Sequence, residues 1–126
     1  MTMRAWSTAA KREAAARTLL EAVAGWPGVT GTRKDARDWR PREIMVTLRK
    51  GPYYCRVDFD GDSRQDCLVI PWNVDCRSAA KYPAHFPAGN VNPYHFAKAT
   101  TVADDLEDAL YWLERGFAAL SPEGAL

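Results

Sequence analysis

The chain has 126 residues and a formal net charge of +1, with 47% hydrophobic and 26% charged residues. This length fits one folded domain, which we place at residues 1–126. A charge so close to zero is unlike that of a strongly basic nucleic-acid-binding domain, and no run of about 20 apolar residues is present to cross a bilayer.

The charge is unevenly distributed along the chain. Residues 1–56 carry 12 Lys and Arg against 5 Asp and Glu, whereas residues 57–126 carry 5 against 11. The basic half therefore has a net charge of +7 and the acidic half −6. Such polarity steers a charged partner, promotes head-to-tail association of copies, or is neutralised by ion pairs within the fold.

The cysteines and the N-terminal stretch bear on the cellular compartment. Cys55, Cys67 and Cys76 form an odd set without the close paired spacing of zinc modules. The first twenty residues contain no apolar leader region. We therefore expect a cytoplasmic protein with reduced thiols, no metal site, no cofactor and no membrane association.

The first predicted element is a helix over residues 7–24. Either Ser7 or Thr8 can cap its N-terminus, and Gly25 followed by Pro27 ends it. Apolar residues recur at helical spacing along one side of this segment, so the helix is expected to bury that side against a sheet.

Three strands are predicted next, at 43–49, 53–60 and 66–72, after a weaker strand signal at 29–32. The first two of the three alternate apolar and polar side chains, which is typical of a strand with one buried and one solvated face. The strand 66–72 is apolar on both faces. Its second face can be covered by the weak strand at 29–32 or by the segment 81–101, and we favour the segment 81–101 because it follows the strand directly and supplies aromatic rings.

A second helix is predicted from a cap at Thr100 or Thr101 to Leu120, with an apolar stripe that begins at Val102. The elements together predict an α+β fold. Its sheet is an antiparallel meander of three or four strands, its two terminal helices pack on one face, and a long ordered loop precedes the last helix.

The segment 81–101 is the strongest candidate for a binding surface. It holds both histidines, three of the eight prolines and four aromatic rings. Aromatic rings give contact area at low entropic cost, and asparagines between prolines present amide groups from a stiff backbone. We predict a non-catalytic binding module for a protein partner, a second copy of itself or a small polar ligand. The candidate residues lie where this segment meets the sheet rim: Trp72, Tyr82, His85, Phe86, Asn90, Asn92, Tyr94 and His95.

A first alternative is nucleic-acid binding through the basic segment 31–56. The order helix, three strands, helix is also that of double-stranded RNA-binding domains. The acidic start of the second helix would repel phosphates, and the connection before it is long, so we rank this alternative lower. Its candidate residues are Arg33, Lys34, Arg37, Arg40 and Arg42.

A second alternative is a small enzyme that uses His85 or His95 with Cys76. Pairs of Cys and His nucleophiles assemble in space rather than in sequence, so the spacing does not exclude one. No catalytic or phosphate-binding motif accompanies these residues. We also expect Cys55 and Cys67 to lie opposite or nearly opposite each other across a hairpin.

The polar face of the strand 53–60 forms one further candidate. Tyr54, Arg56 and Asp58 are expected to lie beside Thr47 and Arg49 of the preceding strand. Opposite charges on neighbouring strands usually satisfy each other, so we expect ion pairs on this face.

Overall fold

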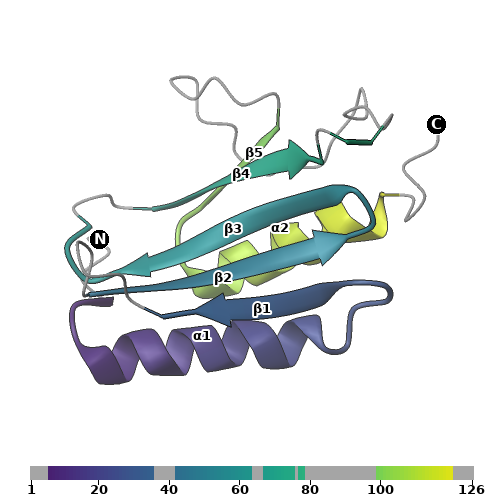
Figure 1. Cartoon of the computed structure of the whole chain (residues 1–126). Coiled ribbons are helices and arrows are strands. Elements are labelled where there is room, and N and C mark those ends of the chain that lie inside the picture. Colours follow the sequence, from purple (N-terminus) through teal and green to yellow (C-terminus); the bar gives the residue numbers. More distant parts are fainter. Residues whose placement is uncertain (1–5, 36–41, 64–66, 76, 79–98, 121–126) are drawn as a thin grey trace.

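The computed structural model describes residues 6–35, 42–63, 67–75, 77–78 and 99–120 (Figure 1). These residues form an antiparallel sheet with strand order β1-β2-β3-β4-β5. The predicted α+β class and meander are confirmed, with five strands in the described part where three or four were predicted. The elements are α1 (Ala9–Val23), β1 (Thr30–Lys34), β2 (Glu43–Lys50), β3 (Tyr53–Asp60), β4 (Leu68–Val74), β5 (Thr100–Ala103) and α2 (Leu106–Ala118).

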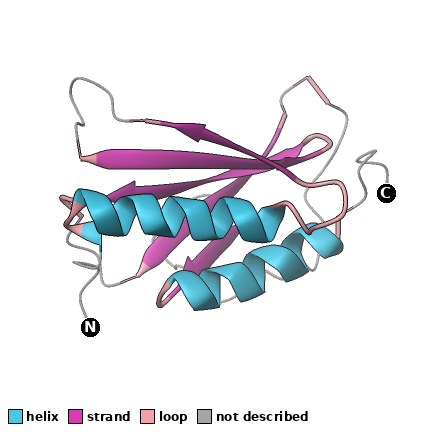
Figure 2. Cartoon of the chain, turned by 90° about the horizontal axis from the view of Figure 1, so that it is seen from below, coloured by secondary structure: helices cyan, strands magenta, loops and turns pink. Residues whose placement is uncertain are grey.

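Both helices lie on the same face of the sheet, as predicted (Figure 2). Helix α1 contacts β1, β2 and β3, whereas α2 contacts β5 and α1. The alternate residues of each strand that point toward the helices form the core. The largest fully buried side chains include Trp72, Tyr53, Phe59, Phe117, Leu19, Leu48, Ile70 and Leu113.

Helix α1 begins close to where its sequence predicts. The Thr8 hydroxyl accepts a hydrogen bond from the Lys11 backbone N–H at 3.2 Å, so Thr8 is the cap. After the helix ends, the chain turns at Gly28, whose φ of 73° lies in the left-handed region that favours glycine. The following strand extends to Lys34, two residues beyond the predicted weak strand.

The predicted start of the second helix was wrong. Thr100 and Thr101 are fully buried in β5, and Val102 belongs to the same strand. Helix α2 begins at Leu106 instead, because the Asp105 carboxylate caps it by accepting from the Asp108 backbone N–H at 2.8 Å. Thr100, Thr101 and Val102 are β-branched, and such residues favour strands. Their pairing with the edge of β4 outweighs the helical spacing of apolar residues that Val102 shares with the following helix.

Strand β4 has apolar residues on both faces, as its sequence indicates, but the two faces differ in burial. Leu68, Ile70 and Trp72 are buried in the core, while Val69 and Pro71 are half-buried on the opposite face. Most of the segment 81–101, which we expect to cover that opposite face, lies outside the described residues. Its role as a cover stays a prediction.

Candidate functional site

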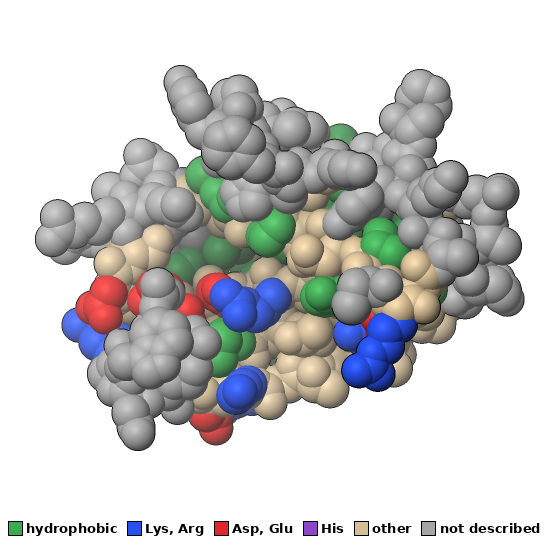
Figure 3. Space-filling model, turned by 45° about the horizontal axis from the view of Figure 1, so that its top comes forward, with side chains coloured by type: hydrophobic (Ala, Val, Ile, Leu, Met, Phe, Trp, Pro, Cys, Tyr) green, Lys and Arg blue, Asp and Glu red, His purple; other side chains and the backbone are tan. Residues whose placement is uncertain are grey.

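The sheet face opposite the helices, which we call the outer face, contains a shallow pocket of about 390 Å³. Strands β2, β3 and β4 supply its lining, so residues far apart in sequence meet there. Acidic, basic and hydrophobic side chains lie next to one another on the side of the molecule shown in Figure 3. The pocket is lined by Thr47, Tyr54, Arg56, Asp58, Val69, Pro71 and Asn73.

The register of β2 and β3 places one cation on an aromatic ring. Arg49 is paired with Tyr54 across the two strands. The Arg49 guanidinium lies over the Tyr54 ring, with its carbon 4.7 Å from the ring centroid. This distance is within the range of a cation–π interaction.

A second cation on the same face has a carboxylate partner. The Arg56 Nε lies 2.9 Å from Asp58 Oδ1, and Arg56 Nη2 donates to Asp58 Oδ2 at 3.0 Å. Arg49 Nη1 also lies 3.9 Å from Asp75 Oδ2. Opposite charges thus pair on this face, but Arg56 and Asp58 belong to the same strand, so this pair does not join neighbouring strands as predicted. The outer face therefore presents hydrogen-bond donors, hydrogen-bond acceptors and one aromatic ring. Its positive and negative side chains nearly cancel one another.

Of the predicted binding residues, only Trp72 of β4 belongs to the described part of the chain. Trp72 is 1% exposed and packs edge-on against Phe117, with ring centroids 4.5 Å apart. Its side chain thus belongs to the core and is not available at the rim. The residues outside the described part are Tyr82, His85, Phe86, Asn90, Asn92, Tyr94 and His95.

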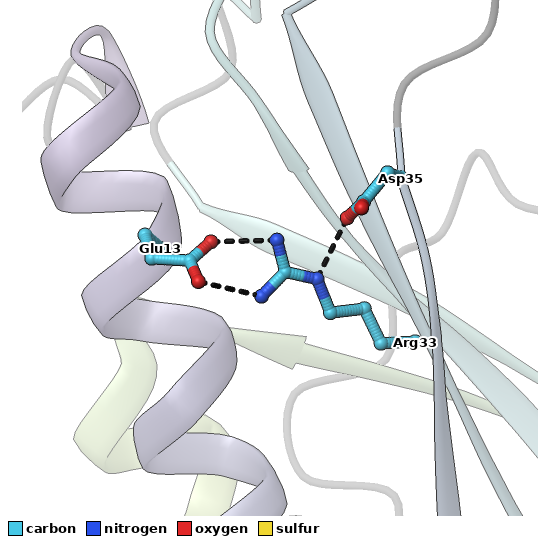
Figure 4. A network of polar contacts seen from close by, with 3 residues as sticks. All are labelled: Glu13, Arg33 and Asp35. Atoms are coloured by element: carbon cyan, nitrogen blue, oxygen red, sulfur yellow. Dashed lines mark hydrogen bonds and ion pairs between the residues drawn. The ribbon is translucent and has the colours of Figure 1, made fainter.

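Two of the five basic residues predicted for nucleic acid, Arg33 and Arg42, are engaged by carboxylates. Arg33 of β1 donates to both carboxylate oxygens of Glu13 on α1, at 2.8 and 2.6 Å, and to Asp35 at 2.7 Å (Figure 4). These hydrogen bonds raise the pKa of Arg33. The hydrogen bond from Arg33 likewise lowers the pKa of the Glu13 carboxyl below 4.5.

The other members of this basic set are more scattered. Arg42 donates to the Ser7 backbone carbonyl at 2.7 Å and lies 3.3 Å from an Asp62 oxygen. Lys34 is exposed at the end of β1. Arg37 and Arg40 lie outside the described residues. Neutralisation within the fold, one of the three interpretations of the uneven charge, thus applies to Arg33 and Arg42.

The expected pairing of Cys55 with Cys67 was wrong. Cys55 lies opposite Trp72, because the connection from Asp60 to Leu68 is longer than a tight hairpin turn and shifts the register. Cys55 is fully buried, and this burial raises the pKa of its thiol. Neither Cys55 nor Cys67 forms a disulfide bond.

The predicted enzyme residues Cys76, His85 and His95 lie outside the described part of the chain. Within that part, no group of three or more His, Cys, Asp and Glu side chains is arranged to hold a metal ion. No helix among the described residues is long and apolar enough to span a membrane.

The chain matches no family model, no curated protein and no solved structure.

Three charged side chains are buried among the described residues, and none of them was predicted from the sequence: Arg12, Glu43 and Lys50. Lys50 ends β2 and is only 8% exposed, and it points to the core side with Val46 and Leu48. The alternation of β2 could have predicted this burial, because Lys50 follows Val46 and Leu48 at every second position and so lies on the same apolar face. The predicted strand 43–49 ends one residue before Lys50, so the prediction leaves this residue out of the strand.

Proposed function

We propose that this protein is a non-catalytic binding module that works through the outer face of its sheet, and that its partner there is a second copy of the chain. The observation that carries the proposal is the neighbouring cation and anion on this face, Arg56 and Asp58, joined at 2.9 Å. Both helices α1 and α2 lie on the opposite face (Figure 2), so no helix of the described residues covers the outer face.

The symmetry of a dimer explains why such a face suits a second copy. In a two-fold interface the same patch meets itself, so each arginine can face the aspartate of the partner. Arg56 and Asp58 can exchange their pairing between subunits without leaving a charge unmatched. Charges of this kind set the orientation and specificity of an interface more than its affinity.

The remaining residues of the outer face supply the contact area. Tyr and Arg are enriched at protein interfaces, and the Arg49–Tyr54 contact presents both side by side. Val69 and Pro71 are half-buried and add an apolar floor.

Two charge-reversal variants test the proposal. Arg56→Asp makes this part of the face acidic and Asp58→Arg makes it basic, so each variant alone should associate more weakly than the wild type. Mixed in equal amounts, the two variants should form a heterodimer, because an acidic face then meets a basic one. Sedimentation equilibrium gives the mass of each sample, and Arg115→Asp on α2 serves as the control that leaves association unchanged.

Two results would overturn the proposal. One is a wild-type protein that keeps the mass of a monomer up to about 1 mM, the concentration that marks a very weak complex. The other is a mixture of the two variants that associates no more than either does alone. In both cases the outer face does not bind a second copy.

A further inference from the structure

A second pocket, of about 350 Å³, lies on the helical side of the molecule. It forms where the turn after α1, the end of β2 and the last turns of α2 come together. Its apolar walls are Trp26, Pro27, Val29 and Phe117. Its polar residues are Lys50 and Glu114, and none of the pocket residues belongs to the outer face.

The fold holds Lys50 against the turn after α1. A Cβ added to Gly28 would lie 3.5 Å from the Lys50 Cε, so the aliphatic stem packs directly beneath this turn. The ammonium group donates a hydrogen bond to the Phe117 backbone carbonyl at 2.8 Å. This carbonyl is at the C-terminal end of α2, where the helix dipole favours a positive charge.

The charge of Lys50 is poorly matched by the protein itself. A lysine ammonium has three donors, and lysines are almost never this buried unless they are paired. Among the described residues, Lys50 is in none of the ion pairs, and its bond to Phe117 is to a neutral carbonyl. An anion in the pocket would complete the coordination of this charge.

We propose that this pocket binds a small organic carboxylate with an apolar body. The carboxylate accepts from the free donors of Lys50, and the body packs on Trp26 and Phe117, whose ring centroids are 6.4 Å apart and inclined at 39°. A single cation in an apolar pocket suits a monoanion, whereas a phosphate dianion needs several donors. The volume is in the usual range for small-molecule sites.

Glu114 lines the same pocket and carries the charge opposite to that of Lys50. Its carboxylate is exposed on the α2 side of the pocket. It therefore repels the anion that Lys50 attracts. Neutralising Glu114 should tighten the binding of a carboxylate, and neutralising Lys50 should weaken it.

The test is a titration with phenylacetate and with its neutral analogue phenylacetamide, followed by ¹H–¹⁵N spectra of the backbone amides and the Trp26 indole. Phenylacetate should bind roughly tenfold or more tightly than phenylacetamide, because the amide carbonyl can still accept a hydrogen bond from Lys50 but carries no negative charge to pair with the ammonium. Lys50→Gln should remove this preference, since glutamine can still donate to the Phe117 carbonyl but carries no charge. Glu114→Gln should tighten phenylacetate binding about twofold or more, and Tyr111→Ser, on the exposed side of α2, should leave it unchanged.

Equal affinities for phenylacetate and phenylacetamide in the wild type would overturn the proposal. So would phenylacetate binding that survives Lys50→Gln, or shifts that avoid Trp26 and cluster elsewhere. If Lys50→Gln does not fold, the wild-type comparison of the two probes and the Glu114→Gln variant decide the question. The titration is independent of dimerisation, because Arg56→Asp should bind phenylacetate as the wild type does.

Discussion

The indole Nε1 of Trp72 donates a hydrogen bond to the Thr101 hydroxyl at 2.7 Å, and this bond joins β4 to β5 between residues 29 positions apart. Both side chains are buried, and the Trp72 ring packs on Phe117 of α2. The Trp72 backbone N–H also donates to the Ala99 carbonyl at 2.9 Å. Trp72 thus fixes the last strand of the sheet and the second helix at the same time.

Removing the Thr101 hydroxyl should destabilise the protein. Thr101→Val keeps the shape of the side chain but leaves the buried Trp72 N–H without this acceptor, which costs about 1–3 kcal/mol of unfolding free energy. Thr101→Ser keeps the acceptor and should lie closer to the wild type. Urea unfolding measures both variants, and equal stability of Thr101→Val and the wild type would contradict the structural role of this bond.

Two glycines near the end of α1 should respond differently to alanine. Gly28 has a φ of 73°, so Gly28→Ala should lower the unfolding free energy by about 1–2 kcal/mol, the cost of a left-handed conformation. At Gly25 an added Cβ would meet only the Ala22 carbonyl at an ordinary 3.6 Å. Gly25→Ala is the matched control and should leave stability unchanged or raise it by up to about 1 kcal/mol. Thermal unfolding of both variants would refute the assignment if their order were reversed.

The ion pair between Glu13 and Arg33 should make stability depend on acid pH. Its hydrogen bond lowers the pKa of Glu13 in the folded protein, so the pair stabilises the fold above pH 4.5. This contribution is lost as the pH falls through the lowered pKa, because the carboxyl then takes up a proton. Glu13→Gln should therefore have a lower urea midpoint than the wild type at pH 7, and the difference should vanish in acid.

A neighbouring glutamate on the same helix provides the control for this experiment. Glu21 is exposed on α1 and forms no ion pair with the residues that the structure describes. Glu21→Gln should leave the urea midpoint unchanged at both pH values. A difference between Glu13→Gln and the wild type that persists in acid would show that the ion pair is not its cause.

The two described cysteines should differ in reactivity. Burial raises the pKa of the Cys55 thiol and shields it from reagents, whereas Cys67 is only half-buried. In the folded protein at pH 8, iodoacetamide should modify Cys67 and leave Cys55 intact until urea is added. Peptide mass spectrometry reads both sites, and equal rates at the two residues would contradict the burial of Cys55.

Local patterns in the sequence were sufficient for most elements of the fold. The alternation in 53–60 marked β3, and the cap at Thr8 and the stop at Gly25 marked α1 to within a few residues. Strand β5 was missed because its four residues directly precede an amphipathic helix, and its strand state comes from pairing with β4, far away in sequence. A strand of four residues that forms only by pairing with a distant strand has no periodic pattern in its own sequence.

The candidate sites were less accessible to sequence reasoning. The outer-face platform of Thr47, Tyr54 and Arg56 was predicted because neighbouring strands and alternation alone place these residues together. The pocket at Lys50 was not, since it needs the end of α2 to meet the turn after α1. Trp72 was expected at the rim, but its position on the core side of β4 decided its burial.

The sequence by itself determined which residues alternate, which segments can be helices and which face of β3 is wet, because these depend on neighbours a few positions away. Only the tertiary structure decided that Thr101 faces Trp72, that Cys55 lies opposite Trp72 rather than Cys67, and that a lysine ends in an apolar pocket. These contacts depend on register and on loop length. A shift of one residue along a strand turns every side chain to the other face, and a single sequence does not specify the register at that precision.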